Sequence, residues 1–169
     1  MLIFISGAVR SGKSTFAESF VKNYATEAKY IATSIRIDDE MSDRIVHHQK
    51  QRAEGDIKWQ TWEQPCNLTE LTFHEDDVVL LDCLTILTAN ELFHDDEDAL
   101  ARIYKGVSHV KTQCKLLIVV SNEVFQEGIP EDEMTREYMY VLGKLHQQLV
   151  QDADEAYLVV HGIATKMKG

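Results

Sequence analysis

A glycine-rich segment near the N-terminus constrains the fold more than any other part of this sequence. Residues 7–14 read Gly-Ala-Val-Arg-Ser-Gly-Lys-Ser and fit the Walker A pattern at every fixed position. The segment follows an apolar run at residues 2–6 and precedes a stretch of helical character. Its glycines permit backbone angles that turn amide groups inward around phosphate oxygens. An accidental glycine turn would not need a strand before it and a helix after it, so the sequence predicts a phosphate-binding loop.

The residues of this loop can be given separate roles. Lys13 is expected to reach the β- and γ-phosphates of a nucleotide, and the Ser14 hydroxyl is expected to ligate Mg²⁺. The helix that begins near Lys13 adds the positive end of its dipole. Asp82 ends another apolar run and is predicted to hold the metal together with Ser14, as a Walker B acid does. The predicted nucleotide-binding residues of the loop are Gly7, Ala8, Val9, Arg10, Ser11, Gly12, Lys13 and Ser14.

Five short apolar runs alternate with segments of helical period along the chain. The runs are continuous rather than alternating, which is typical of a parallel sheet covered on both faces. The predicted strands are residues 2–6, 29–33, 78–82, 116–121 and 156–160, and the predicted helices are residues 14–24, 39–54, 84–93, 97–113 and 131–152, with Pro130 in the first turn of the last. This alternation predicts a three-layer α/β fold. Because no linker or repeat interrupts the 169 residues, we expect a single domain, 1–169.

Charge and cysteine content limit the partners and the location of the chain. The formal net charge of −11 disfavours binding to nucleic acid or to an anionic membrane. No apolar run approaches the ~20 residues that cross a bilayer, and the first residues carry no basic leader. Cys66, Cys83 and Cys114 are too scattered for a disulfide framework or a zinc site, and Cys83 is expected in the core. We therefore expect a cytoplasmic protein that binds neither nucleic acid nor membranes.

A pair of histidines lies in the predicted helix 39–54. Helical spacing places Arg44, His48 and Arg52 on one face, while His47 points about 100° away. The flanking guanidinium groups would disfavour the imidazolium and could bind phosphate oxygens. A neutral His48 could then attack the α-phosphate of a nucleoside triphosphate. A solvated helix face explains the same pattern and is the commoner case in an arbitrary sequence, whereas a metal site does not fit, because adjacent histidines diverge on a helix. The other five histidines receive no role.

These segments belong to a pattern that extends along the whole chain. Besides the loop and the His48 face, it comprises Tyr-Ile-Ala-Thr-Ser at 30–34, Asp-Asp-Glu-Met at 38–41, Trp-Gln-Thr-Trp-Glu at 59–63, Leu-Leu-Asp-Cys-Leu-Thr at 80–85, Asn-Glu-Leu-Phe at 90–93, Ser-Asn-Glu-Val at 121–124, Ala-Asp-Glu at 153–155 and Leu-Val-Val-x-Gly-Ile at 158–163. In these motifs, and in their order, the sequence resembles the bifunctional adenosylcobinamide kinase/adenosylcobinamide-phosphate guanylyltransferase family.

The resemblance implies two reactions and a site. Members of the family phosphorylate the aminopropanol hydroxyl of adenosylcobinamide with ATP or GTP and then transfer GMP from GTP to that phosphate. The GMP is carried on a histidine, and the matching position is His48. Further nucleotide-binding positions implied are Ile35, Arg36, Ile37, Gln49, Lys50, Gln51, Arg52, Glu63 and Asp82. Glu63 and Asp82 could recognise guanine or hold metal, and the resemblance does not decide between them. It also implies a RecA-like fold and a homotrimer.

Two other functions remain open on the sequence. A simple small-molecule kinase would use the same loop without a covalent intermediate, and His48 would then only clamp phosphates. A GTP-binding homologue with reduced catalysis would bind nucleotide without turnover. The general base of the kinase step is also open, with Asp82 and Glu123 as candidates by position.

Overall fold

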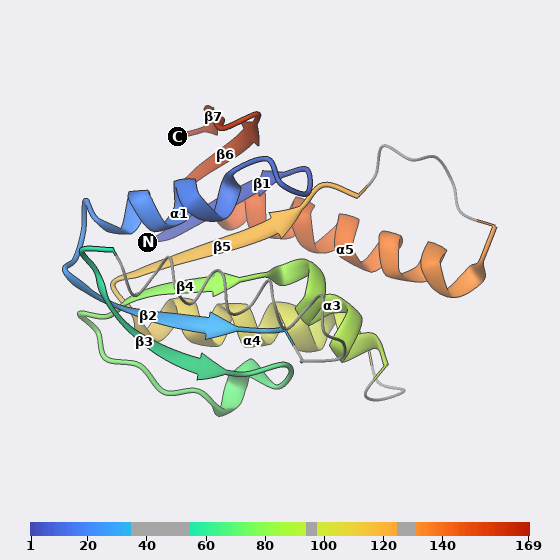
Figure 1. The fold of residues 1–169 in the computed structure, drawn as a ribbon. Helices are drawn as coiled ribbons and strands as arrows, with labels where there is room; N and C mark the ends of the chain where they lie inside the picture. Colours follow the sequence, from blue (N-terminus) through green and yellow to red (C-terminus); the bar gives the residue numbers. More distant parts are fainter. Residues whose placement is uncertain (35–54, 94–97, 125–130) are drawn as a thin grey trace.

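A seven-stranded sheet forms the centre of the molecule, with strand order β3-β2-β4-β5-β1-β6-β7 (Figure 1). The computed structural model describes residues 1–34, 55–93, 98–124 and 131–169. The strands are β1 (Leu2–Gly7), β2 (Glu27–Ala32), β3 (Lys58–Glu63), β4 (Val78–Asp82), β5 (Leu116–Asn122), β6 (Glu155–Val160) and β7 (Ile163–Lys168). Among these described strands, the first six run parallel, and β7 alone pairs antiparallel, with β6. The predicted, mostly parallel α/β sheet is confirmed.

Two edge strands, β3 and β7, were not predicted. All six residues of β7 are at least partly exposed, and β3 shows only two partly buried residues, both tryptophans. Neither segment therefore contains the continuous apolar run that marks a strand buried on both faces. The five predicted strands all contain such a run, and their bounds agree with the structure to within two residues.

Four helices are described: α1 (Lys13–Val21), α3 (Leu84–Leu92), α4 (Ala99–Gln113) and α5 (Glu133–Asp152). Helix α5 begins two residues later than predicted, because the side chain of Asp132 accepts a hydrogen bond from the Thr135 amide and caps the helix there. Pro130, which was predicted to lie in its first turn, lies outside the described residues. The predicted helix 39–54 lies outside the described residues. Among the described helices, none is both long and apolar enough to span a membrane.

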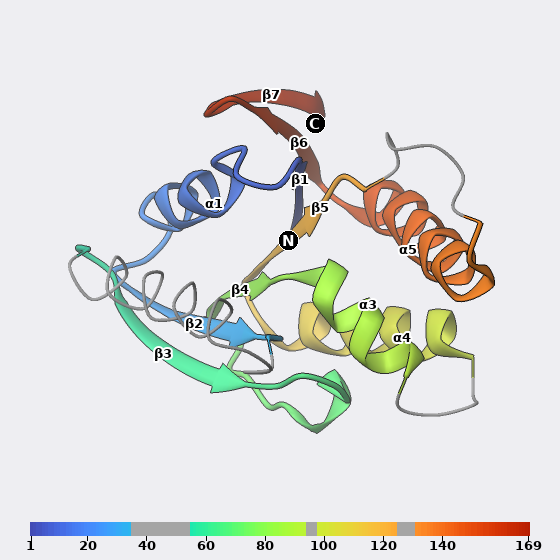
Figure 2. The same cartoon turned by 45° about the vertical axis from the view of Figure 1, so that its right-hand side comes forward.

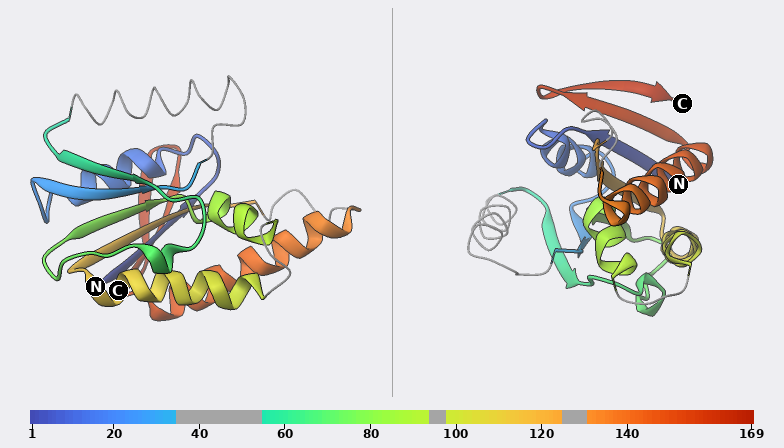
Figure 3. Two further views of the ribbon diagram at one scale, coloured as in Figure 1. Left: turned by 90° about the horizontal axis from the view of Figure 1, so that it is seen from below. Right: turned by 90° about the vertical axis from the view of Figure 1, so that its right-hand side faces the viewer.

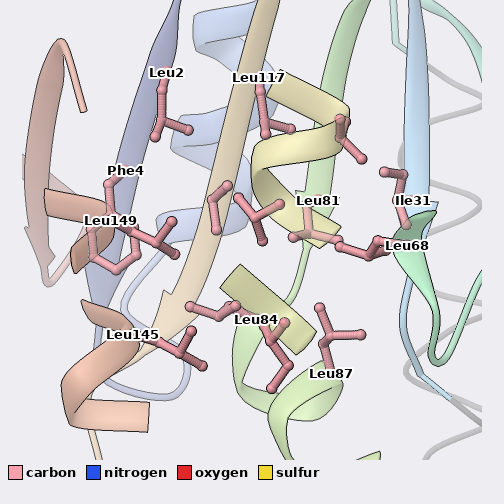
Figure 4. Close-up of a cluster of buried hydrophobic side chains, with 14 of the residues drawn as sticks. Leu2, Phe4, Ile31, Leu68, Leu81, Leu84, Leu87, Leu117, Leu145 and Leu149 are labelled. Atoms are coloured by element: carbon pink, nitrogen blue, oxygen red, sulfur yellow. The ribbon is translucent and has the colours of Figure 1, made fainter. Parts of the chain in front are cut away.

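The helices divide between the two faces of the sheet. Helix α1 covers one face, and α3, α4 and α5 cover the other (Figure 2). The core on the α3–α5 side contains Leu81 and Leu84 together with Leu145 from α5 (Figure 4). The core on the α1 side contains Ile5 and Leu80. Strands β4 and β5 are thus buried on both faces, which explains why their sequences are almost continuously apolar.

The parallel strands all end at the same edge of the sheet, where the candidate site lies. Strand β1 pairs with β5 on one side and with β6 on the other, and β4 lies next to β5. The loops that follow β1, β2, β4 and β5 therefore leave from one edge. Helix α5 extends beyond this edge (Figures 1 and 3). In parallel α/β sheets, ligands bind outside the carboxyl ends of the strands.

Candidate functional site

The predicted phosphate loop connects β1 to α1. The structure explains why glycine is needed at two of its positions. A Cβ on Gly7 would lie 2.5 Å from both Ser11 Oγ and the Val159 carbonyl oxygen, so only glycine fits. Gly12 has φ of +91° and a Cβ there would lie 3.2 Å from Gly162 Cα. The Gly162 amide also donates to the Ser11 carbonyl at 2.8 Å. The turn between β6 and β7 therefore packs directly against the loop and helps to fix its shape.

Lys13 is the first residue of α1, and its long side chain folds back over the loop. The residue is 7% exposed, and its ammonium donates to the Ala8 carbonyl at 3.1 Å. Ser14 follows in the first turn of the helix and is partly buried. The helix N-terminus contributes unpaired backbone amides and the positive end of its dipole. A buried cation, a hydroxyl and backbone amides together can bind the phosphates of a nucleotide.

Asp82 ends β4 on the face of the sheet that α1 covers. Side chains alternate along a strand, so Asp82 shares a face with Leu80, which packs in the core beneath α1. Tyr30, on the neighbouring strand β2, donates its hydroxyl to Asp82 Oδ2 at 3.0 Å and orients the carboxylate. The sequence analysis missed this contact, although Tyr30 stands two residues before the end of β2 and Asp82 is in register with that end.

The pKa of the Cys83 thiol depends on its burial and on the charged groups around it. This pKa is raised to about 11, mainly by burial and also by the Asp82 carboxylate, while the Lys13 ammonium acts to lower it. Lys13 and Asp82 therefore act on the same buried position, from the loop and from β4. Cys83 is 6% exposed, which confirms its predicted place in the core. Thr33 holds the Cys83 backbone, since its hydroxyl donates to the Cys83 carbonyl and accepts from the Cys83 amide, both at 2.9 Å.

Glu63 ends β3 at the outer part of the same edge. It is exposed and lies in register with Ala32, which in turn is in register with Asp82. Strand β2 thus separates the two acids, so their backbones are two strand spacings, or about 10 Å, apart. Asn90 of α3 stabilises this region by donating to the Thr33 carbonyl at 2.9 Å and to the Pro65 carbonyl at 3.0 Å. The two acids occupy separate parts of the edge, with Asp82 nearer to the phosphate loop.

A buried polar chain lies at the end of β5, next to the loop. Ser121 Oγ is 2.7 Å from His146 Nε2 and 3.1 Å from Thr85 Oγ1, and all three residues are 9% exposed or less. His146 comes from α5 and also contacts Phe4, with ring centroids 5.0 Å apart. The sequence analysis gave His146 no role, because nothing in the spacing of α5 shows which strand it will contact.

Burial of His146 makes the stability of the fold depend on pH. Burial lowers the pKa of His146 from 6.5 to about 4. Below about pH 6.5 the unfolded chain therefore binds a proton that the folded chain does not bind until about pH 4. The contribution of His146 to stability should fall through this window by on the order of 3 kcal/mol and change no further below it. Urea unfolding at pH 7, 5.5 and 4.5 should show a smaller decline for His146→Asn than for wild type.

The exposed His74 offers the matched control for this measurement, because His74→Asn removes an imidazole whose side chain is 70% exposed. The free energy of unfolding of His74→Asn should decrease from pH 7 to pH 4.5 by the same amount as that of the wild type. An equal decrease in the free energy of unfolding with falling pH for His146→Asn and for the wild type would contradict the prediction.

Several predicted site residues lie outside the described residues. They are His48 with its flanking Arg44 and Arg52, and the implied nucleotide contacts Ile35, Arg36, Ile37, Gln49, Lys50 and Gln51. The described part of the site therefore consists of the phosphate loop, Asp82 with Tyr30, the end of β5, and Glu63 at the far side of β2.

Comparison with known sequences matches this site to one family. The family model described as cobinamide kinase / cobinamide phosphate guanyltransferase matches residues 3–167, which include the loop, Asp82 and the end of β5. The chain belongs to this family. Membership agrees with the resemblance seen in the sequence, and the family model matches nearly the whole chain.

Three curated relatives support the assignment. The bifunctional adenosylcobalamin biosynthesis protein CobU of Escherichia coli K12 is 36% identical and covers 99% of this chain and 100% of its own length. The CobU protein of Salmonella typhimurium LT2 is 35% identical, with 99% and 100% covered. The bifunctional protein CobP of Pseudomonas aeruginosa PAO1 is 32% identical, with 98% and 96% covered. Sequence and relatives thus align from end to end.

A solved structure supports the fold alone. An ATPase from the type III secretion system of pathogenic bacteria superposes with a TM-score of 0.50 at 9% identity, and the match covers 98% of this chain and 56% of that chain. The present chain thus spans just over half of that ATPase chain. The likeness confirms the predicted P-loop NTPase fold with helices on both faces of a mostly parallel sheet.

Proposed function

We propose that this chain phosphorylates adenosylcobinamide with ATP or GTP and then transfers GMP from GTP to the adenosylcobinamide phosphate. The observation that carries the proposal is an intact phosphate loop, with Lys13 folded over it, in a chain that matches the family over residues 3–167. Three relatives, each named a bifunctional adenosylcobalamin biosynthesis protein, align with this chain over nearly its full length. The chain is therefore a transferase of cobalamin biosynthesis.

In the kinase step, the reacting atoms would lie between the phosphate loop and the carboxyl ends of the neighbouring strands. The acceptor hydroxyl oxygen attacks the γ-phosphorus, the bond to the β-phosphate oxygen breaks, and the nucleoside diphosphate leaves. Lys13 and the loop amides would stabilise the charge on the phosphoryl oxygens during transfer. Asp82 at the end of β4 and Glu123 after β5 are the carboxylates that flank the loop and could accept the hydroxyl proton.

Ser14 and Asp82 would hold Mg²⁺, since a hydroxyl and a carboxylate are the hard oxygen ligands that this cation prefers. Bound there, it would neutralise charge on the phosphates. Tyr30 would keep the Asp82 carboxylate oriented towards it. Glu63 ends β3 about 10 Å from Asp82 across β2, farther from the phosphate loop, and it suits a contact with another part of the nucleotide, such as the donor edge of guanine.

The second step uses a covalent intermediate on His48. An imidazole nitrogen attacks the α-phosphorus of GTP and pyrophosphate leaves. The phosphate oxygen of the acceptor then attacks the same phosphorus and the nitrogen–phosphorus bond breaks, which gives adenosylcobinamide-GDP. Support for this step comes from the family membership and from the Arg44, His48, Arg52 spacing. The same resemblance supports a homotrimer, and the formal net charge of −11 supports the absence of nucleic-acid and membrane partners. The cytoplasmic location stays a prediction from the sequence.

Mass measurement tests the function directly. The purified chain is incubated with adenosylcobinamide, Mg²⁺ and ATP, then with GTP, and both the corrinoid products and the intact protein are weighed. A phosphorylated corrinoid, then its GDP derivative, and a protein carrying one guanylyl group are expected. Phosphorylation without protein-bound GMP would instead favour the simple kinase. Tight GTP binding without any product would favour the homologue with reduced catalysis.

A further inference from the structure

The end of strand β5 loses one of its two neighbours before it reaches the site. Strand β4 pairs with β5 as far as Asp82 and Val120, whereas β1 continues to pair with it as far as Gly7 and Asn122. A backbone amide that faces the missing neighbour needs another partner. The Asn122 amide finds one in the hydroxyl of Thr85, at 2.7 Å. Thr85, in the first turn of α3, thus replaces the strand that has ended.

A chain of buried side chains holds this threonine in place. Thr85 Oγ1 lies 3.1 Å from Ser121 Oγ, and Ser121 Oγ lies 2.7 Å from His146 Nε2. Thr85 and Ser121 are 6% and 0% exposed, so water does not compete for these contacts. The hydroxyl groups can rotate to donate or accept, but the ring of His146 is fixed by its packing against Phe4. His146 is therefore the rigid end of the chain, and α5 carries it.

The other side of the same strand end is attached to the phosphate loop. The Glu123 amide donates to the Gly7 carbonyl at 2.9 Å, and Gly7 is the first residue of the loop. Asn122 is in register with Gly7. The strand end is thus held by Thr85 on one side and by Gly7 on the other, with the partly buried side chains of Asn122 and Glu123 at the carboxyl edge.

We propose that His146 is a positioning residue for phosphoryl transfer, which acts through Ser121 and Thr85 to fix Asn122 and Glu123 beside the phosphate loop. The kinetic part of this inference rests on the proposed kinase function. Small displacements of groups at the reacting atoms are costly, because a shift of about 1 Å can reduce a rate by about 100-fold. Loss of the buried chain should therefore lower kcat more than it weakens nucleotide binding.

Thr85→Val is the first test, since valine keeps the shape of threonine and removes only the hydroxyl. The Asn122 amide then loses its partner, and its hydrogen exchange should accelerate by about 10-fold or more. The kcat of phosphoryl transfer should fall by about 10- to 100-fold, with the Kd of GTP much less affected. Thr88→Val is the matched control, because Thr88 is equally buried on α3 but donates at 2.8 Å to Leu84 of its own helix. Thr88→Val should match the wild type both in hydrogen exchange at the Asn122 amide and in kcat.

His146→Leu and Ser121→Ala test the rest of the chain. Each should reproduce the fall in kcat and the faster exchange at Asn122, and the double variant should be no worse than His146→Leu alone. His146→Asn restores a polar partner for Ser121 and should recover a large part of kcat. Wild-type kcat together with wild-type exchange at Asn122 in Thr85→Val and in His146→Leu would overturn the inference. So would faster exchange spread evenly over the core with kcat per folded molecule unchanged.

The two proposals fail in different ways. If the wild-type chain transfers no phosphoryl group to adenosylcobinamide, the proposed function is wrong. The exchange rates of the Asn122 and Glu123 amides, measured with GTP bound, still decide whether His146 and Thr85 hold the strand end. Faster exchange confined to those amides would support the positioning role, and unchanged exchange would overturn it.

Discussion

A Lys13→Ala variant is expected to lose about 100-fold or more in kcat/KM for phosphoryl transfer, because removing one group that stabilises transition-state charge has effects of this size. Lys13 is almost fully buried, and its ammonium lies over the loop at 3.1 Å from the Ala8 carbonyl. Its charge is thus already held against the loop that would bind the phosphates, largely shielded from water. Transfer of GMP should fall as well, since the same loop holds the triphosphate of GTP. Steady-state assays of both steps measure the two effects.

Lys22→Ala is the matched control for this variant. Lys22 caps the other end of α1 and forms an exposed ion pair with Asp56 at 3.0 Å. Exposed pairs contribute little to stability, so this variant should keep wild-type kinetics and nearly wild-type stability. A Lys13→Ala protein that folds normally and retains the wild-type kcat/KM would contradict the assignment of the loop.

A His48→Asn variant is expected to separate the two activities. Asparagine cannot form the phosphoramidate, so protein-bound GMP should disappear and the second transfer should fall by about 1000-fold or more. The kinase step needs the loop and not the nucleophile, so most of its rate should remain. Incubation with GTP labelled at the α-phosphate, followed by alkaline gel separation, measures the covalent label, while a coupled assay measures the kinase step.

His74→Asn provides the control for His48→Asn. His74 precedes β4, at the edge of the sheet opposite the phosphate loop, and its side chain is 70% exposed. The control should label as wild type does. If His48→Asn becomes labelled normally, another residue is the nucleophile. If the folded variant loses both activities, the kinase step also depends on His48 and not on the phosphate loop alone.

Sequence reasoning identified the parts of the site that depend on short segments. The loop could be predicted because its glycines, Lys13 and Ser14 are contiguous and stand between a strand and a helix. Asp82 could be predicted because a buried parallel strand reads as a continuous apolar run and ends at the carboxyl edge. The order of the strands, which puts Asp82 one strand away from β5 and two from β1, needed the structure.

Contacts between distant segments could not be predicted in the same way. Tyr30 meets Asp82 across 52 residues of chain, and Ser121 meets His146 across 25. Such pairs depend on strand order and on the rotation of α5 about its axis, neither of which a local pattern fixes. A polar residue in an amphipathic helix is usually taken as solvent-exposed, and His146 is an exception because the hydroxyl of Ser121 forms a hydrogen bond with it in the core.

The position of β1 in the sheet has a consequence for synthesis of the chain. Strand β1 pairs with β5 and β6, which come much later in the sequence and end at Asn122 and Val160. The turn at Gly162, which braces the loop, emerges later still. We therefore expect the loop to bind a nucleotide only after β5, β6 and the turn at Gly162 have been synthesised. Nascent or truncated chains that stop before β6 should gain no protection from GTP against proteolysis, whereas the chain of residues 1–169 should.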